Sequence, residues 1–150
     1  MKQLELALRI AVEAHAGQVD KAGQPYAFHP IRVALRLTSE DEQIVALLHD
    51  VVEDCAGWTF DRVALQGFAP HIIEALRSVT KPPDADLSEE RVYMAFIRGA
   101  AANPIGRAVK RADLEDNMDM SRIACPTARD HARIEKYRRA LVVLDSRIRD

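Results

Sequence analysis

Apolar residues recur along most of the chain at steps of three and four residues, the spacing of one face of an α-helix. This spacing prevails over the alternation that is typical of half-buried strands. Together with the breaks rich in proline and glycine, it predicts an all-α fold of about seven or eight helices. The expected helices are residues 2–17, a segment from Pro30, 40–54, 59–67, 70–80, a segment from Ser88, 103–119 and a segment from near Pro126.

Polar residues indicate where several of these helices begin. Thr59 and Asn103 are N-cap candidates, and Ser88 is expected to cap the helix that follows a loop at residues 81–86. The last helix carries an amphipathic stripe in steps of three and four residues, which suits either a core or a homo-oligomer interface. The stripe consists of Ile134, Tyr137, Leu141, Leu144 and Ile148.

The predicted helix at residues 40–54 has one apolar face and one face suited to chemistry. His49, Asp50, Glu53 and Asp54 share the arc opposite the aliphatic residues. One interpretation is a solvated acidic face with a stray histidine. However, the strip lacks the Lys and Arg partners usual on exposed helices, and its carboxylates repel one another unless a cation lies among them. An adjacent imidazole and carboxylate suit a divalent metal.

Such a metal needs further ligands from other segments. His29 lies in a turn-rich stretch directly before Pro30, which holds its ring near a defined backbone. A second run of acidic residues lies near the end of the helix predicted at 103–119, where either Asp113 or Asp116 could supply a ligand. Spacing alone does not choose between these two residues.

Length, charge and composition narrow the class of protein. The 150 residues are expected to form a single domain over 1–150 with a core that needs no disulfides. A net charge of −2 and an aromatic content of 5% argue against a nucleic-acid partner. The two cysteines, Cys55 and Cys125, are too few for a disulfide scaffold. Without an apolar leader or a run of about 18 uncharged apolar residues, the sequence predicts a cytoplasmic protein with no membrane partner.

Four motifs together carry a family resemblance. His49-Asp50 followed by Glu53-Asp54 resembles the HDxxED motif of the HD-domain metal-dependent phosphohydrolases. More specifically, the chain resembles the hydrolase domain of the Rel/SpoT alarmone enzymes and their small stand-alone relatives. The motifs occur in the family's order at residues 14–18 (AHAGQ), 23–34 (GQPYAFHPIRVA), 47–54 (LLHDVVED) and 109–118 (VKRAD followed by NM).

This resemblance implies an all-α HD-domain hydrolase with one bound divalent metal ion, Mn²⁺. It selects Asp113 over Asp116 and implies that Glu53 and Asp54 orient or deprotonate the attacking water. The implied ligands are His29, His49, Asp50 and Asp113. The implied substrate is a small phosphorylated nucleotide of the (p)ppGpp type, from whose ribose 3′ oxygen pyrophosphate would be released. The chain stops at Asp150, so no synthetase domain is expected.

Three further residues are candidates for substrate binding. Lys21 and Lys110 are candidate phosphate contacts, with solvated or acid-paired lysines as the alternative. Asn117 is a candidate for a hydrogen bond to a ribose, and the alternative is a role in capping the helix end.

The chain departs from the family pattern at two places. Asp20 stands where the family usually has the first residue of a basic pair that helps hold the base, and a carboxylate repels phosphate. Glu115-Asp116 is expected to add negative charge near the substrate mouth. Two alternatives therefore accompany the (p)ppGpp hydrolase hypothesis. One is a hydrolase of another phosphorylated nucleotide, and the other is a non-catalytic module that binds a nucleotide or a partner.

Overall fold

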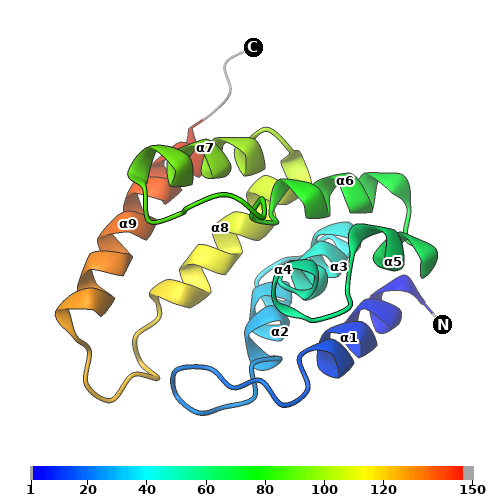
Figure 1. The fold of residues 1–150 in the computed structure, drawn as a ribbon, viewed down its shortest axis with the longest axis horizontal. Helices are drawn as coiled ribbons and strands as arrows, with labels where there is room; N and C mark the ends of the chain where they lie inside the picture. The colour runs from blue at the N-terminus through cyan, green and yellow to red at the C-terminus, as the bar shows by residue number, and fades with distance from the viewer. Residues whose placement is uncertain (1, 147–150) are drawn as a thin grey trace.

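The helical spacing of the sequence corresponds to helices in the computed structural model, which describes residues 2–146. The helices in this part are α1 (Gln3–Ala14), α2 (Phe28–Leu35), α3 (Glu40–Leu48), α4 (Val51–Asp54), α5 (Phe60–Leu65), α6 (Pro70–Ser78), α7 (Glu90–Ala101), α8 (Pro104–Met118) and α9 (Ala128–Asp145) (Figure 1). The all-α prediction is confirmed. The described part has nine helices, or eight if α3 and α4 are counted as the one helix that was predicted over 40–54.

Side-chain caps explain which predicted helix starts are right. The Thr59 hydroxyl oxygen accepts the backbone N–H of Arg62, and Oδ1 of Asn103 accepts that of Gly106, so both are N-caps as predicted. The prediction for Ser88 is wrong, because α7 begins at Glu90. The hydroxyl and backbone N–H of Ser88 both donate to Oδ1 of Asp86, so the Ser88 side chain stabilises the preceding loop instead of capping α7.

Other helix boundaries differ from the predictions by a few residues. The first helix ends at Ala14 rather than at residue 17, where Gly17 adopts a left-handed φ of 85°. The second begins at Phe28, which keeps Pro30 within the first turn, where proline is tolerated. The last begins at Ala128 because Thr127 and Asp130 form a capping box.

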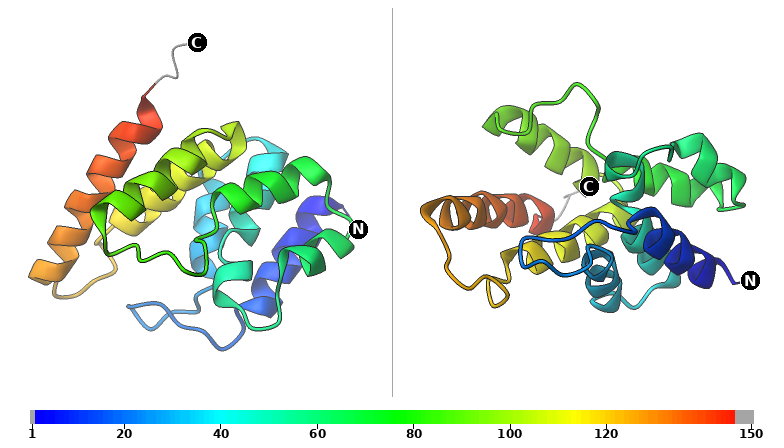
Figure 2. Two further views of the ribbon diagram at one scale, coloured as in Figure 1. Left: turned by 45° about the horizontal axis from the view of Figure 1, so that its top comes forward. Right: turned by 60° about the horizontal axis from the view of Figure 1, so that its bottom comes forward.

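Helix α8 lies between two hydrophobic cores. Val109 and Ala112 belong to a core built mostly from α1 to α6, whereas Leu114 belongs to a smaller core shared with α7 and α9. Figures 1 and 2 show α8 in yellow, with α7 and α9 together on one side of it. Its other side packs on α2 and α3. Residues of α8 can therefore meet those at the start of α2 and the end of α3.

The apolar stripe of α9 is used within the chain. Ile134 and Leu144 are buried, and Tyr137 and Leu141 are half-buried against the smaller core. Ile148 lies outside the described residues. Between residues 2 and 146, every helix is too short or too polar to be a transmembrane segment.

Two glycines provide a matched test of the packing between helices. A Cβ at Gly106 of α8 would lie 2.0 Å from Oγ of Ser78, whereas a Cβ at Gly99 of α7 would meet nothing within 4 Å. We expect Gly106→Ala to destabilise the fold by about 1–3 kcal/mol through overpacking. Gly99→Ala should stabilise it by about 0.5–1 kcal/mol through helix propensity. Urea unfolding midpoints measure both effects, and equal shifts in the same direction would contradict the packing of α6 on α8.

Candidate metal centre and adjoining cleft

The polypeptide breaks its helix at the pair His49-Asp50. The prediction of one continuous helix over 40–54 is wrong, because α3 ends at Leu48 and α4 begins at Val51. The His49 ring explains the break, since its Nδ1 lies 2.5 Å from the carbonyl oxygen of Ala46. In a continuous helix this carbonyl would accept the backbone N–H of Asp50. The break turns both side chains towards α2 and α8.

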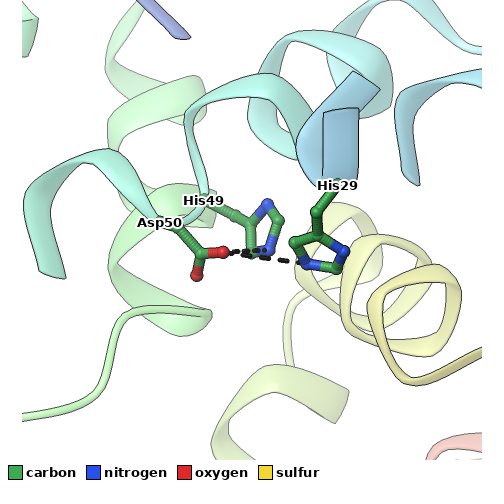
Figure 3. A group of neighbouring side chains, drawn as sticks. All are labelled: His29, His49 and Asp50. Carbon is green, nitrogen blue, oxygen red and sulfur yellow. Dashed lines mark ion pairs between the residues drawn. The ribbon is translucent and has the colours of Figure 1, made fainter. Parts of the chain in front are cut away.

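Four side chains from three parts of the chain meet there, and we call them the His/Asp cluster: His29, His49, Asp50 and Asp113. Nε2 of His29 lies 2.9 Å from Oδ1 of Asp113 and 3.7 Å from Oδ2 of Asp50. Nε2 of His49 lies 3.1 Å from the same Asp50 oxygen and 3.4 Å from the same Asp113 oxygen. Figure 3 shows both imidazole rings directed at the Asp50 carboxylate. The cluster unites all four residues that the family resemblance implies as ligands.

The tautomer of His49 leaves a buried nitrogen without a partner. A carbonyl oxygen only accepts, so Nδ1 of His49 carries the proton and donates it to Ala46. In the neutral ring Nε2 then carries a lone pair, in a residue that is 3% exposed, and no hydrogen-bond partner for it exists within residues 2–146. A buried polar atom without a partner is costly, and such atoms in native structures frequently mark a ligand site.

His29 presents its Nε2 in the same way. Its Nδ1 donates to Oδ2 of Asp116 over 2.7 Å, because an ionised carboxylate only accepts. Nε2 of His29 faces Oδ1 of Asp113 at 2.9 Å, and in the neutral tautomer that keeps the proton on Nδ1 it carries a second lone pair. Two lone pairs and two carboxylates directed at one point require a positive charge between them.

The pKa values of the cluster express the same requirement. Burial lowers the pKa of His49, but the charges of Asp50 and Asp113 outweigh burial and raise it well above its ordinary value. Burial raises the pKa of Asp50, yet the nearby charge of His49 brings it down to about 2. Thus a proton or a cation is favoured inside the cluster.

The residues present fit a divalent metal ion. Two imidazole nitrogens and two carboxylates form a mixed N/O set that suits metals such as Mn²⁺, Fe²⁺ or Zn²⁺. The orphan Nε2 of His49 supports this fit independently of the resemblance. Outer contacts also hold the ligands, since the Tyr26 hydroxyl donates to Oδ2 of Asp50 over 2.6 Å and Nζ of Lys110 to Oδ2 of Asp113 over 2.9 Å.

The acidic pair Glu53 and Asp54 lies on the other side of Asp50. Carboxylate oxygens of these three residues lie within 4.8 Å of one another, and both members of the pair are exposed. Oε1 of Glu53 accepts the backbone N–H of Lys81 over 2.8 Å. Partial burial, followed by the charge of Asp50, raises the pKa of Asp54, and burial raises that of Glu53 as well. A carboxylate with a raised pKa is a better proton acceptor.

A cleft of about 280 Å³ begins at His29 and opens between the loop at residues 19–26 and the start of α9. Its wall is rich in hydrogen-bond donors, which suits an anionic ligand. The donors are Lys21, Arg32, Asn117, Arg122 and Arg133. Nδ2 of Asn117 also donates to Oδ1 of Asp113 over 3.1 Å, which links the cleft to the cluster.

The structure thus brings Lys21 and Asn117 to the cleft, but it places Lys110 elsewhere. Lys110 is half-buried between Asp113 and the ring of Phe96, and it is not among the residues that line the cleft in the described part of the chain. The ammonium group of Lys110 pairs with the Asp113 carboxylate and compensates its charge. A contact between Lys110 and a substrate phosphate stays a prediction.

The two departures from the family pattern have structural explanations. Oδ1 of Asp20 accepts the backbone N–H groups of Ala22 and Gln24, each over 2.9 Å, so this carboxylate shapes its own loop at the cleft. The expectation that Glu115-Asp116 adds charge at the mouth is wrong. Asp116 is 1% exposed, and its carboxylate is paired with Arg32. Oε1 of Glu115 lies 3.4 Å from Nε of Arg111, and Glu115 is not among the described residues that line the cleft.

Sequence reasoning missed the roles of Asp116 and Tyr26 as partners of metal-ligand candidates. A signal for Asp116 was present, because a spacing of three residues places Asp113 and Asp116 on one face of a helix. No comparable spacing links Tyr26 to Asp50, and only the fold brings them together.

Comparison with known proteins gives a consistent picture. No protein-family model matches the chain. The chain is 30% identical over 123 residues to the guanosine-3′,5′-bis(diphosphate) 3′-pyrophosphohydrolase of Aquifex aeolicus, covering 78% of this chain and 17% of that protein. It is 35% identical over 85 residues to the bifunctional (p)ppGpp synthase/hydrolase SpoT of Escherichia coli, covering 54% of this chain and 12% of that protein. The chain therefore spans less than a fifth of the length of these relatives.

A solved structure resembles the whole fold. It belongs to a metazoan orthologue of SpoT that hydrolyses ppGpp, with a TM-score of 0.81 and 26% sequence identity. The match covers 97% of this chain and 87% of that one. Both the sequence matches and the fold therefore connect this chain with the hydrolase part of Rel/SpoT proteins.

The fit to a metal predicts that Mn²⁺ stabilises the protein through the cluster. Saturation at 100 times the dissociation constant adds about 2.7 kcal/mol to the unfolding free energy, which thermal melts with and without Mn²⁺ detect. His49→Ala should abolish the shift, whereas His71→Ala should retain it. His71 is a matched control because its Nε2 also lies 2.8 Å from a carboxylate, that of Asp41, on the exposed surface. A full shift in a folded His49→Ala protein would contradict the assignment.

Proposed function

Because the chain is a Rel/SpoT hydrolase-like HD domain, we propose that it is a metal-dependent phosphohydrolase that removes pyrophosphate from guanosine 3′-diphosphates of the (p)ppGpp type. The observation that carries this proposal is the orphan Nε2 of His49, in a cluster of two histidines and two aspartates beside a cationic cleft. An anionic ligand in the cleft would lie directly beside His29 of the cluster.

The proposed ion is one Mn²⁺, held by His29, His49, Asp50 and Asp113. The mixed nitrogen and oxygen ligands favour Mn²⁺ over a thiolate-seeking metal. When bound, the ion supplies Lewis-acid chemistry, which lowers the pKa of water and offsets negative charge on phosphate oxygens.

The remaining chemistry is assigned to the chain's own residues. Glu53 accepts a proton from the attacking water, and Asp54 helps to orient that water. The backbone N–H of Lys81 holds the Glu53 carboxylate in place. Water adds to the phosphorus atom, the bond from phosphorus to the ribose 3′ oxygen breaks, and that oxygen takes up a proton. The products are GDP or GTP and pyrophosphate.

The cleft is the proposed nucleotide site. Lys21, Arg122 and Arg133 line its wall and are the proposed phosphate contacts. Each also pairs with a carboxylate, that of Asp130 or Asp119, with which a phosphate group would compete. Asn117, which lines the cleft and donates from Nδ2 to Oδ1 of Asp113, is the proposed partner of a ribose hydroxyl. The same wall contains the carboxylate of Asp20, at the position where the family resemblance led us to expect a basic residue that helps hold the base. Nucleotides with other bases should therefore be tested as well.

We expect Glu53→Gln to lower kcat by about 10²- to 10⁴-fold, because the amide cannot accept the proton. Its Mn²⁺ affinity should stay within about threefold of the parent value, because Glu53 is not one of the proposed ligands. Glu89→Gln is the control, since it removes an exposed carboxylate at the start of α7. Steady-state kinetics with saturating guanosine 3′,5′-bis(diphosphate) and Mn²⁺ give kcat, and calorimetry gives the Mn²⁺ affinity.

A nucleotide panel distinguishes the alternatives. Pyrophosphate released only from guanosine 3′-diphosphates, and not by Asp50→Ala, would support the proposal. Turnover of a different phosphorylated nucleotide would keep the metal chemistry and change the substrate. Nucleotide binding without product in the Mn²⁺-loaded protein would contradict catalysis and favour a binding module.

A further inference from the structure

Asp116 is a buried carboxylate that lies outside the His/Asp cluster but touches it. Its side chain is 1% exposed, and its Oδ2 accepts the Nδ1–H of His29 over 2.7 Å. Carboxylates that contact the far nitrogen of a metal-binding imidazole fix the ring's orientation and tautomer.

Three arginines hold this carboxylate in place. Nε of Arg32 donates to Oδ1 of Asp116 over 2.9 Å, and Nη2 of Arg32 donates to Oδ2 over 3.1 Å. This two-point contact fixes the plane of the carboxylate. Nη2 of Arg122 lies 3.7 Å from Oδ2, and Nη2 of Arg36 lies 4.0 Å from Oδ1. Asp116 is therefore ionised and immobile, and it can only accept from His29.

A neutral His29 has a choice between two tautomers. With the proton on Nδ1, Asp116 accepts it and Nε2 is free to bind a metal. With the proton on Nε2, Oδ1 of Asp113 accepts it at 2.9 Å, and the nitrogen that faces the cluster is blocked. The two neighbouring carboxylates thus compete for one proton, and only one outcome leaves a lone pair in the cluster.

We propose that Asp116 is a positioning residue that selects the Nδ1–H tautomer of His29, so that Nε2 remains available as a metal ligand. Two pairs of residues with a spacing of three form this arrangement. His29 and Arg32 lie three residues apart on α2, and Asp113 and Asp116 lie three residues apart on α8, so each pair shares a helix face. The inference rests on the proposed function, because it takes the cluster as the metal site.

The first test reads the tautomer without metal or substrate. Nitrogen-15 correlation spectra of the apo protein at alkaline pH distinguish a protonated Nδ1 from a protonated Nε2. We expect His29 to carry its proton on Nδ1 in the parent protein and in Asp116→Asn, whose amide oxygen can still accept it. In Asp116→Ala we expect the proton on Nε2, towards Asp113. The same tautomer in Asp116→Ala as in the parent protein would overturn the proposal.

The second test measures Mn²⁺ affinity by calorimetry. Asp116→Ala should weaken Mn²⁺ binding by about 10- to 100-fold, and Asp116→Asn should recover part of the loss. Glu115→Gln is the matched control, because it removes the adjacent, half-exposed carboxylate of α8, which contacts Arg36 and Arg111 but not His29. Its affinity should stay within twofold of the parent value. An unchanged affinity in Asp116→Ala would contradict the positioning role.

The two readouts also separate this inference from the proposed function. If the parent protein binds Mn²⁺ but releases no pyrophosphate, the proposed activity fails and the tautomer test still decides the role of Asp116. If Asp116→Ala does not fold, the double variant Asp116→Asn/Arg32→Gln replaces it in the tautomer experiment. The double variant should retain the Nδ1–H tautomer of His29, because the amide oxygen of the new side chain still accepts from Nδ1. Loss of that tautomer in the double variant would overturn the proposal.

Discussion

The structure depends on one constraint, which is that two carboxylates and two imidazole lone pairs face one another inside the protein. The Nε2 atoms of His29 and His49 and the carboxylates of Asp50 and Asp113 lie within 2.9–3.7 Å of one another in four pairs. Buried charge of one sign is unfavourable unless a cation or protons compensate for it. The raised pKa values of both histidines show that protons can serve when no metal is bound. A divalent ion would replace those protons and satisfy every member of the cluster.

The fold meets this constraint by placing α8 between two cores. One face of α8 carries Asp113 towards α2 and the break after α3, while Leu114 packs on α7 and α9. Lys110 and Arg32 bring compensating positive charges to Asp113 and Asp116 from the outer side of the cluster. The interior of the cluster is thereby left with acceptors and lone pairs. The same helix carries Asn117 to the cleft, so a single element connects the metal site with the proposed nucleotide site.

Much of this arrangement could be predicted from the sequence, and the exceptions have identifiable causes. The apolar spacing predicted the helices, and the motifs around His29, His49 and Asp113 predicted residues that the fold brings together. The break at His49-Asp50 could not be predicted, because it depends on the His49 ring taking the carbonyl of Ala46. Ser88 was expected to cap a helix, but Asp86 binds its hydroxyl first. The spacing places Asp116 on the face of Asp113, but its three arginine partners could not be predicted, since they come from α2, from the residue after it and from the loop after α8.

The central claim is that the metal binds at the histidines of the His/Asp cluster, rather than between Asp50 and the exposed carboxylates of Glu53 and Asp54. The ligand atoms of His29, His49 and Asp50 lie within 4.8 Å of one another, and so do those of Asp50, Glu53 and Asp54. Only the cluster contains buried imidazole nitrogens. Anomalous X-ray diffraction at the manganese absorption edge, on crystals grown with Mn²⁺, separates them directly. The account predicts a single manganese peak in contact with Nε2 of His29 and Nε2 of His49. A peak in contact with Glu53 and Asp54, with none at the histidines, would contradict it.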